Sequence, residues 1–131
     1  MKISFSSRYV DKSDEYMDKL KKGFARIMWV MEADSKRLCP VDTGFLRNSI
    51  NLNKISDLHY ELIASAPYAS FVEYGTSPHV IKPVKAKALH FKSKEGKDVY
   101  AKWVWHPGTN PQPYFRPAYW MARENIKNLL K

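Results

Sequence analysis

The sequence predicts an α+β fold in which a long N-terminal helix and a C-terminal helix pack on an antiparallel sheet of about four to five strands. Apolar stripes at helical spacing lie near both ends of the chain, and short alternating segments separated by turn residues fill the middle. Strands bracketed by helices are typical of this class, because the helices cover a face of the sheet. We expect one domain spanning residues 1–131, since this length suits a single core.

The first third of the chain predicts a strand and then the longest helix. Residues 2–9 alternate between apolar and polar side chains, which is typical of a half-buried strand. Ser13 is a candidate N-cap for a helix that runs to Leu38, because Pro40 disfavours helical geometry in the residue before it. Trp29 falls on the polar side of this helix. The apolar stripe consists of Met17, Leu20, Phe24, Ile27, Met28, Met31 and Leu38.

A turn at residues 40–44 leads into a predicted hairpin and a short helix. Residues 46–52 alternate as a strand would, and residues 58–65 form its antiparallel partner beyond a polar turn at residues 53–57. Residues 67–75 predict a short helix, with proline at its start and glycine at its end.

The next segment predicts a long surface loop followed by a second hairpin. Residues 76–87 contain two prolines and little periodicity, with an extended portion around Val80 and Ile81. Residues 88–91 and 99–105 are the candidate strands of the hairpin, because a charged turn that contains glycine separates them.

A proline-rich connector and a closing helix end the chain. Residues 106–113 contain three prolines, which remove backbone donors and fix local angles, so we expect a rigid connector. A helix then covers residues 117–130, with small and aliphatic side chains on one face. Trp120 lies off that face and is predicted to point outward.

Charge and composition limit the classes of partner. Lys and Arg number 22 against 13 Asp and Glu, giving a net charge of +9 and favouring acidic partners, including nucleic acid. Basic residues often stand one helical turn from acids, which favours an ordinary solvated surface. Cys39 is the single cysteine, so neither an internal disulfide nor a thiolate metal cluster can form. No signal peptide or membrane-spanning apolar run is visible.

The residue types that support catalysis lack catalytic spacing. The histidines stand in no metal-binding pattern, and structural roles are favoured for all four: His59, His79, His90 and His106. Cys39 has no nucleophile motif around it and is expected to be a small buried residue. Asp42-Thr43-Gly44 matches the aspartic-protease triplet in letters only, and a turn in which Asp42 accepts backbone hydrogen bonds is the favoured interpretation. We expect no enzyme, cofactor, metal site or small-molecule substrate.

Aromatic and basic residues interleave in residues 100–106. This composition can stack bases and hold phosphates. On a strand, however, Trp103 and Trp105 share one face, and such a face is more often core or subunit interface. Trp29, Trp120, Trp103 and Trp105 are therefore the candidate subunit-interface residues.

Motifs recur in a definite order along the chain: residues 39–50, residues 72–76, His106-Pro107-Gly108, and residues 111–118. Together they resemble the tail-component proteins of long-tailed bacteriophages, a family that includes neck and tail-completion subunits. The resemblance extends over most of the chain, and its order and spacing are more specific than any one segment. Cys39 replaces the small residue usual before the proline, and Tyr114 stands where phenylalanine is common. The matching residues are Pro40, Asp42, Thr43, Gly44, Leu46, Arg47, Glu73, Tyr74, Gly75, His106, Pro107, Gly108, Pro113, Phe115, Arg116 and Pro117.

The resemblance implies an α+β structural subunit of a phage or prophage tail. Such subunits assemble with themselves into a ring, commonly six-fold, and join or complete the tail at the head-tail junction. The implied partners are further copies and other neck and tail proteins, and the implied location is the virion, after synthesis in the host bacterial cytoplasm. The positive balance can also face DNA crossing the ring lumen, although acidic neighbouring subunits explain it equally well. The alternative function is a small basic nucleic-acid-binding protein or a toxin-like ribonuclease.

Overall fold

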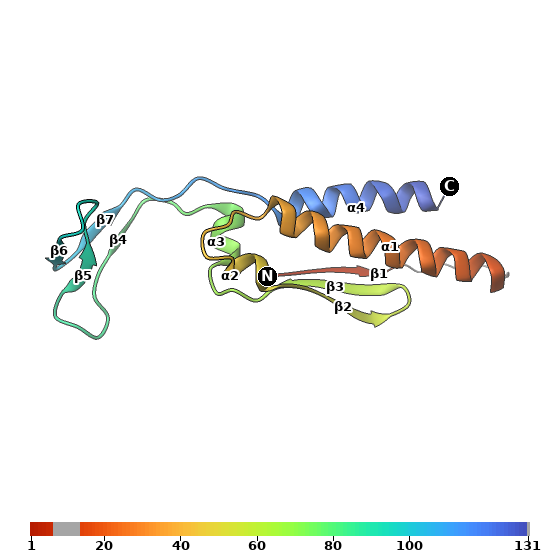
Figure 1. Cartoon of the computed structure of the whole chain (residues 1–131), viewed down its shortest axis with the longest axis horizontal. Helices are drawn as coiled ribbons and strands as arrows, with labels where there is room; N and C mark the ends of the chain where they lie inside the picture. Colours follow the sequence, from red (N-terminus) through yellow and green to blue (C-terminus); the bar gives the residue numbers. More distant parts are fainter. Residues whose placement is uncertain (7–13, 131) are drawn as a thin grey trace. The chain divides into compact units, whose positions relative to one another are not determined.

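The computed structural model describes residues 1–6 and 14–130, which form two compact units (Figure 1). Unit 1 comprises residues 1–74 and 111–131, and unit 2 comprises residues 75–110. The α+β class is confirmed, as are the long N-terminal helix and the C-terminal helix. That residues 1–131 act as one domain stays a prediction.

Unit 1 combines helices with a three-stranded antiparallel sheet of strand order β1–β3–β2. In Figure 1, α1 and α4 run side by side in opposite directions along one side of this sheet. The elements are β1 (Lys2–Ser6), α1 (Asp14–Leu38), α2 (Phe45–Asn48), β2 (Ile50–Ser56), β3 (His59–Ala64), α3 (Ala69–Tyr74) and α4 (Phe115–Leu129).

The core of unit 1 is built where the apolar stripes of both helices meet the inward face of the sheet. Along β3 every second residue is buried, as the period of a strand requires. Phe5 on β1 stacks on Tyr119 of α4, with ring centroids 5.0 Å apart, so the C-terminal helix also contacts the sheet edge. Core members include Phe24, Met28, Met31, Ile50, Tyr60, Leu62, Ala64, Phe115, Ala118 and Ala122.

Two predicted segments of unit 1 differ in the structure. Leu46 was expected on a strand but lies in the short helix α2, and the strand begins only at Ile50. A spacing of four residues between these two apolar positions fits both a helix and a strand, so the local pattern was ambiguous. Residues 53–56 continue β2 instead of turning, because Asn53, Lys54 and Ser56 pair with β3, with a register shift at Ile55. Tyr9 and Ser13 lie outside the described residues.

Unit 2 consists of two separate two-stranded antiparallel sheets, β4–β7 and β5–β6. The predicted single sheet of four to five strands is therefore wrong: the strands distribute over small sheets of two or three. The predicted strand at residues 99–105 breaks near Trp103, because its two halves pair with different partners. The elements are β4 (His79–Ile81), β5 (Leu89–Lys92), β6 (Asp98–Ala101) and β7 (Val104–His106).

Candidate functional site

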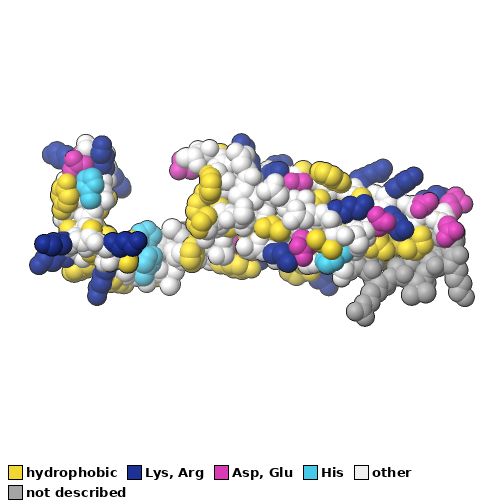
Figure 2. All heavy atoms as spheres, turned by 90° about the horizontal axis from the view of Figure 1, so that it is seen from below, with side chains coloured by type: hydrophobic (Ala, Val, Ile, Leu, Met, Phe, Trp, Pro, Cys, Tyr) yellow, Lys and Arg dark blue, Asp and Glu magenta, His cyan; other side chains and the backbone are white. Residues whose placement is uncertain are grey.

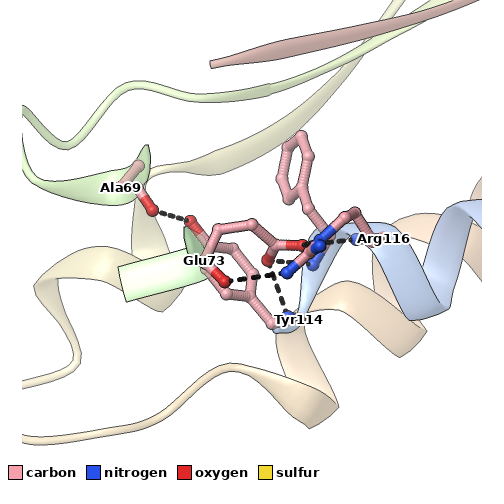
Figure 3. A network of polar contacts seen from close by, with 5 residues as sticks. Ala69, Glu73, Tyr114 and Arg116 are labelled. Atoms are coloured by element: carbon pink, nitrogen blue, oxygen red, sulfur yellow. Dashed lines mark hydrogen bonds and ion pairs between the residues drawn. The ribbon is translucent and has the colours of Figure 1, made fainter. Parts of the chain in front are cut away.

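A buried carboxylate organises the junction between α3 and the start of α4 (Figure 3). Glu73 is fully buried. Its Oε2 accepts hydrogen bonds from the backbone N–H of Tyr114 at 2.8 Å and of Phe115 at 2.9 Å. Its Oε1 accepts from the backbone N–H and the Nε of Arg116, both at 2.9 Å. Four donors thus converge on one carboxylate.

The carboxylate replaces a local cap for α4. The N-cap residue Tyr114 makes no side-chain cap bond, and the first turn contains no acid. Unpaired N–H groups at a helix start require acceptors, and the helix dipole favours a negative charge there. Glu73 supplies both from more than forty residues earlier in the chain. Arg116 in turn donates from Nη2 to the backbone oxygen of Glu73 at 3.2 Å.

Hydrogen bonding decides the charge state of this carboxyl. Burial alone would raise the pKa of Glu73, but the backbone N–H groups of Phe115, Tyr114 and Arg116 and the Arg116 side chain outweigh burial and lower the pKa. The group is therefore ionised at neutral pH. The ionised carboxylate of Glu73 accepts four hydrogen bonds and is paired with Arg116, so its role is to hold α3 and the start of α4 together.

Aromatic side chains flank the Glu73 network. The hydroxyl of Tyr114 donates to the backbone oxygen of Ala69 on α3 at 3.1 Å, and burial raises the pKa of this phenol far above its ordinary value. The Arg116 guanidinium lies 4.6 Å from the ring centre of Tyr74, a cation–π distance. The motif residues of two distant segments therefore lie together: Glu73 and Tyr74 with Phe115 and Arg116. The sequence identified these residues but not their contact.

The residues 40–44 form a tight turn that ends in a left-handed glycine. Gly44 has φ of +85°, which favours glycine, and its backbone oxygen accepts from Asn48 N–H at 2.9 Å to start α2. The hydroxyl of Thr43, not the carboxylate of Asp42, accepts from Phe45 N–H, at 3.4 Å. The turn that was predicted is present, with its side-chain acceptor one residue later than expected.

An open groove of about 290 Å³ borders this turn. Phe45 and Tyr68 line it and remain 56% and 41% exposed, with ring centroids 6.1 Å apart. Leu46, by contrast, is buried in the core, and exposed Arg47 follows it. Behind the turn, Cys39 is buried, and burial raises the pKa of its thiol more than nearby Arg47 lowers it. A raised thiol pKa reduces the thiolate fraction available as a nucleophile.

The motif residues His106, Pro107 and Gly108 of the proline-rich connector lie in unit 2, where the two ends of the unit are joined, and Pro113 lies in unit 1. Thr76 and Thr109 exchange backbone hydrogen bonds at 3.0 Å in both directions. Between them, Gly108 has φ of +83°, and a Cβ there would approach the backbone oxygen of Thr76 to 2.3 Å. Gly108 N–H donates to Nδ1 of His106 at 3.1 Å, and Pro107 separates the two. We call the paired Thr76 and Thr109, with Gly108 beside them, the clasp. Position 108 requires glycine because of its positive φ and because a side chain there would collide with Thr76.

The four histidines lie in three different places, and two of them are neighbours. His59 bonds to Ser4 Oγ at 2.7 Å, and His90 bonds to Asp98 at 3.1 Å. His79 and His106 face each other across β4–β7, with ring centroids 4.9 Å apart. Within residues 1–6 and 14–130, no three His, Cys, Asp or Glu side chains gather as metal ligands would. In the same residues, no helix is long and apolar enough to cross a membrane.

All four tryptophans named as interface candidates are exposed. Trp29 on α1 is 64% exposed, and Trp120 on α4 is 53% exposed with its ring 5.5 Å from the Arg123 guanidinium. Trp103 and Trp105 are 59% and 58% exposed, so neither contributes to a core within this chain. Exposed tryptophans are typical of surfaces that bind a partner.

Comparison with known proteins gives one match. A family model described as "Bacteriophage HK97-gp10, putative tail-component" matches residues 7–75, just over half of the chain. The matched stretch includes the 40–44 turn, the β2–β3 hairpin and Glu73, and it ends where unit 2 begins. No curated protein and no solved structure matches the chain.

Proposed function

The chain belongs to the HK97-gp10-like family of bacteriophage tail components, and we propose that it is a ring-forming subunit at the head-tail junction, acting as a neck or tail-completion protein. Family membership supports a structural role in a phage or prophage tail, with the virion as its location and other tail proteins as its contacts. The ring, its six-fold symmetry and its position are the proposed part.

The exposure of large aromatic side chains on a rigid framework carries this proposal. Trp29 and Trp120 project from long helices whose other faces are fixed in the core. Tryptophan is enriched among residues that dominate binding energy, and preordered surfaces lose little entropy on docking. Trp29, 64% exposed on a helix that is fixed in the core, is therefore a candidate anchor for a partner.

A closed ring needs two different surfaces on each subunit, because neighbours meet head to tail. Unit 1 offers two candidates: the exposed faces of α1 and α4, where Trp29 and Trp120 lie, and a groove bordered by Phe45 and Tyr68. The Glu73 network locks α3 to α4 and so holds the wall of the groove in a fixed shape. Both surfaces are therefore suited to repeated, identical contacts.

The role we propose is structural and not catalytic, without cofactor or small-molecule substrate. The raised pKa of the Cys39 thiol, which reduces its nucleophilic thiolate fraction, supports this part of the proposal. His79 and His106, whose ring centroids are 4.9 Å apart, are the pair to test for acid–base chemistry. The test is an RNA-cleavage assay on the wild type and on His79→Ala and His106→Ala. We expect no cleavage above background, and robust cleavage that both substitutions abolish would contradict the structural role.

Assembly is tested on the purified chain by size-exclusion chromatography and native mass spectrometry. We expect wild-type rings, and we expect Trp29→Ala or Trp120→Ala to shift the protein to smaller species. Ile55→Ala is the matched control, because this side chain is 56% exposed near the tip of the β2–β3 hairpin and is not assigned to an interface. Unchanged assembly of both tryptophan variants would contradict the proposed contacts.

The position in the particle requires a separate test by electron microscopy. Particles made without this subunit should show filled heads and finished tails that remain unjoined. Intact, joined particles, or heads without any tails, would contradict the junction role. Restoring the subunit in trans should rejoin the two parts.

A further inference from the structure

The positive charge of the chain is concentrated in unit 2. Residues 75–110 contain seven lysines, no arginine and only two acids, Glu95 and Asp98, which gives a net charge of +5. The remainder of the chain has 15 basic and 11 acidic residues, a net charge of +4 over more than twice the length. Little more than a quarter of the sequence therefore carries over half of the net charge.

The lysines of unit 2 are available to an external partner. All seven are exposed, and Figure 2 shows dark-blue side chains projecting from several sides of the smaller unit. Across the described part of the chain, the acids of unit 2 have one lysine partner, Lys97 with Glu95 at 3.6 Å, and Asp98 is hydrogen-bonded to His90 at 3.1 Å. Six lysines thus lack a carboxylate partner there: Lys82, Lys85, Lys87, Lys92, Lys94 and Lys102.

Unit 2 lacks a buried core among its residues 75–110. None of residues 75–110 is fully buried, although Val84, Tyr100 and Trp103 are large and apolar. Two-stranded hairpins without a core are only marginally stable in water. Most side chains of this unit are therefore exposed, and most of its charged side chains are cationic.

We propose that unit 2 binds the sugar–phosphate backbone of double-stranded DNA without sequence preference. Unpaired lysines on a surface that is rich in cations and poor in acids are what electrostatic contact with phosphates requires. Lysine acts as a point charge and does not impose the paired geometry that arginine favours, which suits a contact that tolerates any sequence. The choice of DNA as the polyanion rests on the proposed tail function.

Charge argues against a second copy of the chain as the main occupant. A neighbouring unit 1 has a net charge of +4 and a neighbouring unit 2 one of +5, so this surface and either partner would repel each other at long range. Trp103 and Trp105 can add contacts to sugars or bases at the edge of the bound DNA. Single-stranded DNA and a protein partner remain as outcomes that the experiment separates.

The test is fluorescence anisotropy of a labelled 24-base-pair duplex with the full-length protein at several salt concentrations. We expect a dissociation constant of roughly 10⁻⁶–10⁻⁴ M near physiological salt and a log–log slope of about −4 to −6, because each neutralised phosphate contributes about −0.9. The triple variant Lys82→Gln, Lys85→Gln, Lys87→Gln should reduce the slope by about 2 to 3 and weaken binding at least about tenfold.

The matched control is Lys19→Gln, Lys22→Gln, Lys127→Gln, which removes the same charge from exposed positions of unit 1. We expect it to retain most of the wild-type slope. An absence of duplex binding at 50 mM salt, equal losses in both triple variants, or binding of single strands alone would overturn the proposal. So would a unit 2 variant that binds DNA normally but changes oligomeric state. Native mass spectrometry of the same samples reports the ring separately, so the two proposals can fail independently.

Discussion

Arg116 and Glu73 are joined at three points although 43 positions separate them in the chain. The backbone N–H and the Nε of Arg116 both donate to Glu73 Oε1 at 2.9 Å, and its Nη2 donates to the Glu73 backbone oxygen at 3.2 Å. The carboxylate is fully buried, whereas the arginine side chain is 45% exposed. The pair therefore ties α3 to the start of α4, and two predictions about stability rest on this tie.

Replacing the charged acceptor should weaken unit 1 strongly. In Glu73→Gln an amide NH₂ must face backbone donors, so at least one buried N–H loses its acceptor. We expect the free energy of unfolding to fall by about 3 kcal/mol, because hydrogen bonds to buried charged groups exceed neutral ones. Urea denaturation measures this. Glu15→Gln, on the exposed first turn of α1, should change stability by less than about 0.5 kcal/mol.

Stability should fall in acid because of the same carboxyl. Burial opposes ionisation of Glu73, but the hydrogen bonds prevail, so its pKa in the folded protein lies below the ordinary value of 4.5. The stabilisation is therefore complete above about pH 4.5 and is lost as the pH falls through the lower folded pKa. Urea midpoints from pH 7 to 3 measure it. The wild type should lose its advantage over Glu73→Gln across this range, and a constant difference would contradict the assignment.

Ser35 should be replaceable with a gain in stability. Its Oγ is buried in α1 and, among the described residues, has no hydrogen-bond partner. Ser35→Ala removes that unsatisfied group and improves helix propensity, so we expect a gain of about 1 kcal/mol. Ser49→Ala is the contrasting control, because Ser49 Oγ donates to the Leu46 backbone oxygen at 2.7 Å. Its stability should fall by about 1 kcal/mol, and thermal unfolding compares the two.

Alanine substitutions at Gly108 and Gly96 should distinguish the cost of backbone strain from the cost of a steric clash within unit 2. Both have positive φ, but a Cβ at Gly96 meets open space, whereas one at Gly108 meets the backbone oxygen of Thr76. Gly96→Ala should cost about 1–2 kcal/mol from conformation alone, and Gly108→Ala should cost more. Hydrogen exchange of the Thr76 and Thr109 amides measures the clasp directly. Equal exchange in both variants would contradict the steric argument.

The sequence predicted the parts of the fold that repeat over short distances. The buried stripe of α1 is apolar from Leu20 to Met31, with polar Ser35 as its next buried position, and the end of this helix before Pro40 follows from the proline. The turn glycines Gly44 and Gly75 both have the positive φ that their positions suggested. The sequence identified Glu73 as a motif residue but did not reveal that it caps α4. Patterns within a few turns of the chain cannot connect an acid on α3 to the first turn of a helix about forty residues later.

What the sequence determined by itself was the α+β class, the two long helices, the tight turns and the total charge, since each depends on residue type and on spacing within a few turns. Only the tertiary structure decided that Glu73 caps α4 and that the strands form small separate sheets. These features depend on which distant segments meet. Which segments pair is decided by the free energy of burial and hydrogen bonding in the folded chain, and this cannot be deduced from residue spacing along the sequence.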